Sequence, residues 1–179
     1  MESPATADDF TPLSMHKLFR PSSGEQQTIR VTMSGIILNR KANLYLGDAG
    51  HKGRGVFCKT NIKKGEVLET APALLLNERD TQHTDKTMLM NYVFVMGDLS
   101  KKMRQSAGIK KLDHASAVIM GLMAFCNHDE KNNAEIHWEE HEGTLYYVLT
   151  ALKDIPKGKE ICTSYGPTWF ADRTDIKKK

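Results

Sequence analysis

The sequence predicts a β-rich α+β domain, and three observations lead to that fold class. Short apolar segments separated by glycine and proline turns fill residues 28–76, and similar segments fill residues 134–164. Between them, residues 84–125 contain helical spacing and a long apolar run. Blocks of strands beside a block of helix are typical of α+β folds, and 179 residues is the length of one domain.

The first half of the chain is expected to form strands joined by tight turns. Residues 1–27 are rich in Ser, Thr, Pro and charge, so we expect a poorly ordered N-terminal arm. Ile29, Val31 and Met33 alternate with polar residues, which predicts a strand over 28–38. A glycine-rich loop is expected at 47–55 and a turn at 61–65. Further strands are predicted at 44–46, 56–58, 66–70 and 73–76.

The middle of the chain is expected to be helical. Met88, Leu89, Tyr92 and Val93 lie at helical spacing and predict a helix over 84–94. Asp113 is a suitable N-cap for a second helix over 114–125. The polar and basic residues between these segments, 97–112, are expected to form a solvated loop.

The last third returns to strands. Residues 134–138 and 144–151 flank a short polar connection and predict a β-hairpin. A polar turn is expected at 129–133, a second turn at 154–158 and a final short strand at 160–164. Residues 171–179 form a basic C-terminal tail.

Composition argues against several classes of protein. A net charge of +3 is too small to predict direct binding to nucleic acid. Cys58, Cys126 and Cys162 are widely spaced and form no C-x-x-C pair, which argues against a disulfide framework or a zinc cluster and suits a reducing compartment. No apolar stretch resembles a signal peptide or approaches the roughly 20 residues that span a bilayer. We therefore expect an intracellular protein of nucleus or cytoplasm, without a membrane partner.

Three motifs carry the candidate chemistry: Gly53-Arg-Gly-Val-Phe57, Asn127-His128, and the closing segment 151–166, which ends in Tyr165-Gly166. Each has an ordinary structural explanation when taken alone. The glycine pair fits a turn between strands, Asn127 fits a helix cap, and Tyr165 fits an aromatic residue at a strand end. Their shared order along one chain is more specific than any one of them.

In that order, the motifs resemble the SET domain, the fold of S-adenosylmethionine-dependent protein-lysine methyltransferases. The resemblance implies several small sheets, a short helical insert and a C-terminal pseudoknot that brings Tyr165 beside Asn127, with the domain spanning 28–170. Cys-rich zinc-binding segments before and after the domain are absent, so the chain looks most like the small stand-alone members. It departs from the family pattern at Asp129, where a small Ser or Cys is usual, and at Asn132, where Pro is usual.

The resemblance also implies roles for individual residues. The catalytic side chain would be Tyr165, which would orient the substrate amine. The residues at the S-adenosylmethionine cofactor would be Gly53, Arg54, Gly55, Asn127, His128 and Trp169. The aromatic residues lining a substrate lysine channel would be Tyr92, Phe94, Tyr147 and Phe170, although core packing is an alternative for each of them. The histidines lack ligand spacing, so no metal site is expected.

The implied reaction is methyl transfer to a lysine side chain of a protein, either a histone tail or a non-histone target. A free lysine has a pKa near 10.4, so forming the neutral amine at pH 7 costs about 4.6 kcal/mol, and the site must lower that cost. The competing hypothesis is a catalytically weak or inactive SET domain that serves as a protein-binding module, motivated by the extra carboxylate of Asp129. The acidic hairpin around Glu139 fits either a lysine-rich peptide or simple solvation.

Overall fold

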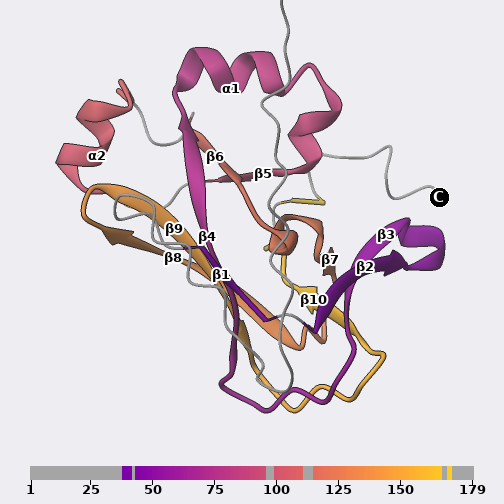
Figure 1. Ribbon diagram of the computed structural model, residues 1–179. Coiled ribbons are helices and arrows are strands. Elements are labelled where there is room, and N and C mark those ends of the chain that lie inside the picture. Colours follow the sequence, from indigo (N-terminus) through magenta and orange to yellow (C-terminus); the bar gives the residue numbers. More distant parts are fainter. Residues whose placement is uncertain (1–37, 42, 96–98, 111–114, 167–168, 171–179) are drawn as a thin grey trace, which may run out of the picture.

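The computed structural model describes residues 38–41, 43–95, 99–110, 115–166 and 169–170. Two β-sheets, linked by short helical turns, make up this part of the chain (Figure 1). The expected arm at 1–27, all but the last residue of the strand predicted at 28–38, and the tail at 171–179 lie outside the described residues.

The larger sheet has six strands, in the order β5-β6-β4-β9-β8, with β1 paired to β4. Its strands are β1 (Asn39–Arg40), β4 (Val67–Leu76), β5 (Val93–Val95), β6 (Ser116–Ile119), β8 (Ala134–His141) and β9 (Thr144–Ala151). The predicted hairpin is confirmed as β8 and β9, which pair from Ala134 and Ala151 to His141 and Thr144. The side chains of β8 alternate between exposed and partly buried, as expected for an edge strand with one solvated face.

The smaller sheet has four strands in the order β2-β3-β10-β7. They are β2 (Leu44–Asp48), β3 (Arg54–Cys58), β7 (Asn127–His128) and β10 (Glu160–Thr163). β10 is antiparallel to β3 and parallel to β7, with Cys162 opposite Asn127 and Thr163 opposite His128. The closing segment of the chain is thereby inserted between a strand from its first third and the Asn127-His128 motif.

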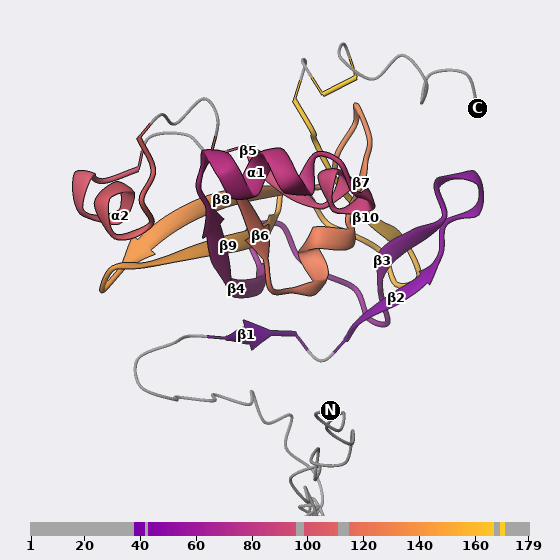
Figure 2. The same ribbon diagram turned by 90° about the horizontal axis from the view of Figure 1, so that it is seen from above.

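Helical segments are short and lie between the strands. They are η1 (Gly50–Lys52), α1 (Glu78–Thr84), η2 (Met88–Asn91), α2 (Lys101–Ser106) and η4 (Leu122–Phe125). Asn77 caps α1 and Ser100 caps α2 through their side-chain oxygens. Seen from above, the β8–β9 and β2–β3 hairpins extend to opposite sides of the molecule (Figure 2).

Both predicted helices of the middle segment are wrong. Residues 84–94 divide into the end of α1, the turn η2 and strand β5, because Val93 pairs with Val118 across the larger sheet. Within 114–125, the apolar run forms β6 and then η4, separated by an extended Gly121. A short apolar run fits a buried strand as well as a helix, and here sheet pairing decides.

Three smaller expectations also change. The loop expected at 97–112 contains α2, whose Met103 is buried in the core. The strands predicted at 66–70 and 73–76 are one strand, β4, which continues through Pro72. Pro72 has no N–H, and its carbonyl accepts a hydrogen bond from the Met120 N–H at 3.0 Å. Much of the loop expected at 47–55 belongs to β2, η1 and β3.

Two turns of similar sequence, which begin at Ile62 and Ile155, pair with each other. Ile62 and Ile155 are each 1% exposed and exchange two backbone hydrogen bonds of 2.9 Å. Asp154 accepts hydrogen bonds from the Lys63 ammonium and from the Lys64 N–H, both at 2.9 Å. The pairing of these turns fixes the start of β10, which leads into Tyr165.

Candidate active site

A cavity of about 580 Å³ lies where the three sequence motifs meet. This volume is within the usual range for a site that binds a small molecule. Most of its lining side chains are aromatic, basic or amide. The residues that line it are His51, Lys52, Arg54, Asn91, Tyr92, Ala124, Phe125, Asn127, His128, Tyr165, Trp169 and Phe170.

Tyr165 is held in this cavity at both ends. Its hydroxyl donates a hydrogen bond of 2.8 Å to the carbonyl oxygen of Cys126. Its backbone N–H donates to Nδ1 of His128 at 3.1 Å. Burial raises the pKa of Tyr165 to about 12, so the phenol is neutral at physiological pH. Because the hydroxyl proton is directed at Cys126, the oxygen presents its remaining lone pair toward other groups.

His128 acts as an acceptor in this arrangement. Since Nδ1 accepts the Tyr165 N–H, the neutral ring carries its proton on Nε2. The ring centroid of His128 lies 5.5 Å from that of Tyr165 and 4.8 Å from that of Phe170. The imidazole therefore positions the segment after β10, and the same residue lines the cavity.

Asn127 ties the motif to the glycine loop and to the closing strand. Its side-chain amide donates to the Arg54 carbonyl at 2.9 Å and to Oε1 of Glu160 at 2.7 Å. Oε2 of Glu160 also accepts a hydrogen bond from the Lys52 ammonium at 2.7 Å. A Cβ atom on Gly55 would lie 2.5 Å from Oε1 of Glu160, so a larger residue at this position would displace the carboxylate.

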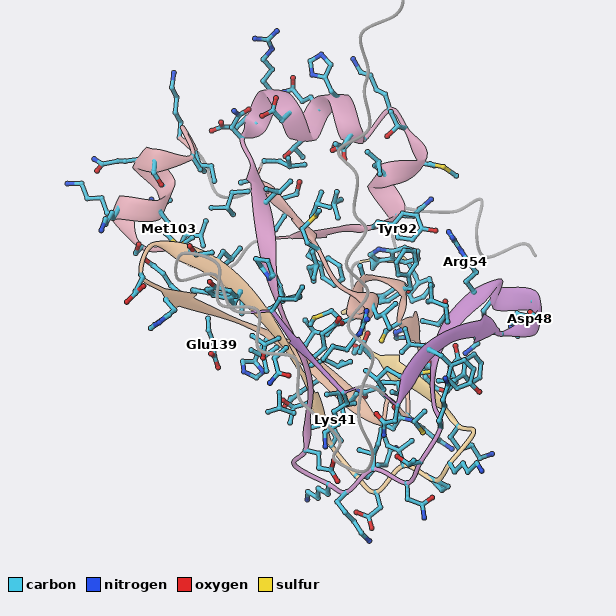
Figure 3. All side chains as sticks on the ribbon, viewed as in Figure 1. Lys41, Asp48, Arg54, Tyr92, Met103 and Glu139 are labelled. Atoms are coloured by element: carbon cyan, nitrogen blue, oxygen red, sulfur yellow. The ribbon has the colours of Figure 1, made fainter. Side chains whose placement is uncertain are left out.

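The glycine loop presents a positively charged edge to the cavity. Gly53, with a φ of +79°, does not line the cavity: its N–H donates to the Gly50 carbonyl at 2.8 Å, and its own carbonyl accepts the Ala49 N–H at 2.6 Å. The guanidinium of Arg54 donates to the Tyr92 hydroxyl at 3.0 Å and lies 5.1 Å from the centroid of the Phe125 ring. Figure 3 shows Arg54 and Tyr92 extending toward one another from β3 and from the end of η2.

Two aromatic residues close over Tyr165. The Trp169 ring centroid lies 4.8 Å from that of Tyr165 and 4.7 Å from that of Phe170. Phe170 and Tyr165 are stacked, with their centroids 6.3 Å apart. Trp169 and Phe170 therefore cover the part of the cavity wall that Tyr165 forms.

Two of the predicted channel residues lie elsewhere. Phe94 and Tyr147 pack against each other with a centroid separation of 5.6 Å, and neither lines the 580 Å³ cavity. Tyr147 is only 4% exposed, so core packing accounts for its position. By contrast, Tyr92 and Phe170 do line the cavity.

Asp129 does not line the 580 Å³ cavity. It lines a separate cavity of about 360 Å³, and its Oδ1 accepts the Lys131 N–H at 2.7 Å. The departure from the family pattern at this position therefore supplies a local turn rather than a second carboxylate in the 580 Å³ cavity. This geometry removes the observation that motivated an inactive binding domain.

Sequence reasoning missed several residues around the cavity. Lys52 and Phe125 lie just before the first and second motifs, and residue type alone does not distinguish a lining residue from a solvated or core residue. Glu160 is the clearest omission, because its two partners come from motifs far apart in sequence. Glu160 lies in the closing motif, and that position was the one feature of the sequence that could have pointed to it.

Two absences concern the described residues. No group of three or more His, Cys, Asp or Glu side chains in them is placed to hold a metal ion. No helix among them is long and apolar enough to cross a membrane.

Comparison with known proteins gives one family and several relatives. The sequence matches the SET domain family over residues 53–166, more than half of the chain. It is 27% identical over 134 residues to a Schizosaccharomyces pombe histone-lysine N-methyltransferase specific for lysine 37 of histone H3. That alignment covers 74% of this chain and 80% of the relative.

Two solved structures share the fold. A Plasmodium falciparum protein assigned as a histone methyltransferase aligns with a TM-score of 0.50 at 22% identity, covering 72% of this chain and 96% of that chain. The Neurospora SET-domain protein DIM-5, a histone lysine methyltransferase, aligns with a TM-score of 0.54 at 23% identity. The second alignment covers 72% of this chain and 54% of DIM-5.

Proposed function

The chain belongs to the SET-domain family of protein-lysine N-methyltransferases, and we propose that its 580 Å³ cavity binds S-adenosylmethionine with Tyr165 as the catalytic side chain. The SET fold and the lysine methyltransferase activity predicted from the sequence motifs are confirmed by the family match and by the relatives. The observation that carries the proposal is the Tyr165 hydroxyl, fixed by Cys126 at the point where all three motifs converge.

The residues of the cavity fit this cofactor. Its amino-acid end carries a carboxylate, and the cationic side chains of Lys52 and Arg54 line the cavity where they can pair with it. Its adenine ring needs flat apolar surface, which Phe125 and Trp169 offer. The cradle beside Gly55, which a Cβ would fill, lets the glycine loop approach Asn127 closely. When bound, S-adenosylmethionine supplies an activated methyl group on a sulfonium.

Tyr165 orients the reacting amine. Methyl transfer is a direct displacement, so the protein chiefly aligns the nucleophile and stabilises developing charge. The Tyr165 oxygen, whose proton points at Cys126, accepts a hydrogen bond from the lysine amine and so directs the nitrogen lone pair. The neutral state of the phenol at pH 7 keeps it from attracting a lysine ammonium as a counter-ion.

The aromatic wall favours the neutral amine. Tyr165, Trp169 and Phe170 exclude water from one side of the site, and a less polar environment lowers the pKa of an entering lysine. The rings also provide faces for the methylated ammonium product. Tyr92 and Phe170 line the lysine entry, and Asn127 and His128 hold the backbone that meets the cofactor.

A histone tail is the substrate class that we propose first. The relatives named above act on histone lysines, and the exposed acidic hairpin around Glu139 suits a basic peptide. A non-histone protein with a basic segment is the second candidate. The proposed location is the nucleus or the cytoplasm, where both kinds of substrate occur.

Two measurements test the proposal. Calorimetric titration with S-adenosylmethionine should show one site per chain, and the absence of binding would leave only a protein-binding role. Labelled cofactor with separate histones and with whole-cell extract should then mark a lysine-containing protein. Labelling of extract proteins alone would exclude the histone proposal.

The role of Tyr165 is tested by substitution. Tyr165→Phe should lower the transfer rate by about 100-fold, because it removes the oxygen that directs the amine. Tyr45→Phe is the matched control, since Tyr45 stacks on Phe57 in the β2–β3 hairpin and does not line the cavity. Equal rates for the two variants would remove Tyr165 from the mechanism.

A further inference from the structure

Glu69 is a buried carboxylate that the proposed mechanism does not yet use. It lies in β4 next to a register irregularity and is only 1% exposed. Carboxylates are seldom fully buried unless their oxygens are paired. Each of its two oxygens accepts one backbone hydrogen bond, from the N–H of Leu122 at 3.0 Å and from the N–H of Met123 at 2.6 Å.

These two N–H groups begin η4, the turn that leads into the Asn127-His128 motif. The N-cap of η4, Gly121, has no side chain and makes no capping hydrogen bond. Glu69 therefore supplies from another strand the acceptors that a capping side chain normally supplies. A Cβ on Gly121 would lie 3.0 Å from Oε1 of Glu69 and 2.8 Å from Cβ of Ala71, so the turn and β4 are in direct contact.

A continuous series of contacts joins Glu69 to the catalytic candidate. The Met123 N–H is bound to Glu69, and the Met123 carbonyl accepts the Cys126 N–H at 3.1 Å. The Cys126 carbonyl then accepts the Tyr165 hydroxyl at 2.8 Å. The Glu69 carboxylate thus fixes, through one short turn, the position of the Cys126 carbonyl that orients the Tyr165 hydroxyl.

We propose that Glu69 is a positioning residue for the transfer reaction: by holding η4 it sets the Cys126 carbonyl that orients the Tyr165 hydroxyl. This inference rests on the proposed role of Tyr165. Glu69 does not line the cavity and touches neither substrate nor cofactor in it, so its effect is expected on kcat and not on cofactor affinity. A residue with only a structural role would change stability and leave kcat per folded molecule unchanged.

The test compares Glu69→Gln with a matched control. The carboxamide keeps one acceptor oxygen but turns an NH₂ donor toward the second N–H, so one of the two hydrogen bonds is lost. Glu66→Gln is the control, because Glu66 also accepts a backbone N–H, that of Lys63, and pairs with Lys41 away from the cavity. We expect Glu69→Gln to lower kcat by about tenfold, with the S-adenosylmethionine Kd within about twofold, and Glu66→Gln to leave both within about twofold.

A double-mutant cycle shows whether Glu69 acts through Tyr165. In a Tyr165→Phe background the hydroxyl is absent, so Glu69→Gln should lower the residual rate by less than about twofold. A tenfold loss in both backgrounds would overturn the proposal, and so would an unchanged kcat in the single variant. Full activity of Tyr165→Phe would instead overturn the proposed role of Tyr165 itself.

Hydrogen exchange gives a readout that is independent of activity. Glu69→Gln should speed amide exchange over residues 122–126 and leave the β8–β9 hairpin unchanged, whereas unchanged exchange over 122–126 overturns the inference whatever the rates. If Glu69→Gln does not fold, Gly121→Ala displaces the same carboxylate from the opposite side and is expected to give the same loss of kcat.

Discussion

Gly55 is the position at which one added methyl group should disturb the whole candidate site. The Cβ of Gly55→Ala would lie 2.5 Å from Oε1 of Glu160, 3.0 Å from Nδ2 of Asn127 and 3.1 Å from Cβ of Ala49. The first separation is well below van der Waals contact, so the Glu160 carboxylate has to move. Its hydrogen bonds to Asn127 and to Lys52 are then lengthened or lost.

The magnitude follows from these contacts. Overpacking a filled site costs about 1–3 kcal/mol, and loss of a hydrogen bond to a charged group costs about 1.5–3 kcal/mol. The Lys52–Glu160 ion pair is partly exposed and adds little. We therefore expect Gly55→Ala to lower the free energy of unfolding by about 2.5–6 kcal/mol, which corresponds to a Tm decrease of about 5–24 °C.

Urea unfolding and calorimetric titration with S-adenosylmethionine measure the two consequences, stability and binding. Gly47→Ala is the matched control, because Gly47 pairs with Gly55 across the β2–β3 hairpin. The added Cβ would lie 2.9 Å from the Phe57 ring and would not displace Glu160. Gly47→Ala should therefore lower stability without weakening cofactor binding.

A double-mutant cycle identifies the contact responsible. Glu160→Ala removes the oxygen nearest to the new Cβ, so the effect of Gly55→Ala should be at least 1 kcal/mol smaller in that background, on the order expected for coupled neighbours. If Gly55→Ala unfolds within about 0.5 kcal/mol of the parent protein, or if its effect is the same with and without Glu160, the assigned geometry of this site is wrong.

Three further predictions concern Glu69, Asn133 and Cys126. Burial raises the pKa of the Glu69 carboxyl in the folded protein. The stability that its protonation gives is therefore complete below the pKa of Glu69 in the unfolded chain, and it declines as pH rises through the folded pKa. In urea titrations, Glu69→Gln should consequently lose more unfolding free energy at pH 4 than at pH 7, and an equal loss at both pH values would contradict this. Asn133→Ala removes hydrogen bonds to the Glu160 carbonyl and from the Cys162 N–H, and chemical unfolding should show a loss of about 1–3 kcal/mol. Burial raises the pKa of the Cys126 thiol well above its ordinary range, so iodoacetamide at pH 8 should label it only after denaturation; rapid labelling of native protein would disprove its burial.

The candidate site was more predictable from sequence than the helices were. The motifs predicted that Tyr165 and Asn127 would lie close together, and strand pairing between β10 and β7 accounts for that proximity. The close approach of a ligand expected at Gly53–Gly55 stays a prediction, and the neighbour that the structure does place against Gly55 is the carboxylate of Glu160.

The helical predictions failed because local spacing does not record pairing partners. Val93 satisfies a helical pattern, but its pairing with Val118 in β6 places it in a sheet. The same limit explains why Glu69 was missed, since its two hydrogen-bond donors lie more than 50 residues further along the chain. Among the predicted channel residues, Phe94 and Tyr147 have aromatic side chains suited either to a channel or to a core, and only their mutual packing distinguishes the two.

The central place of β10 in the smaller sheet has a consequence for how the enzyme matures. A nascent chain that ends before residue 160 lacks the strand that lies between β3 and β7, and so cannot join the two sides of the pocket around Tyr165. Contacts between such distant segments form slowly, because the intervening loop must close first. Catalytic competence should consequently emerge in the last kinetic phase of refolding, after the β8–β9 hairpin has acquired its protection from solvent.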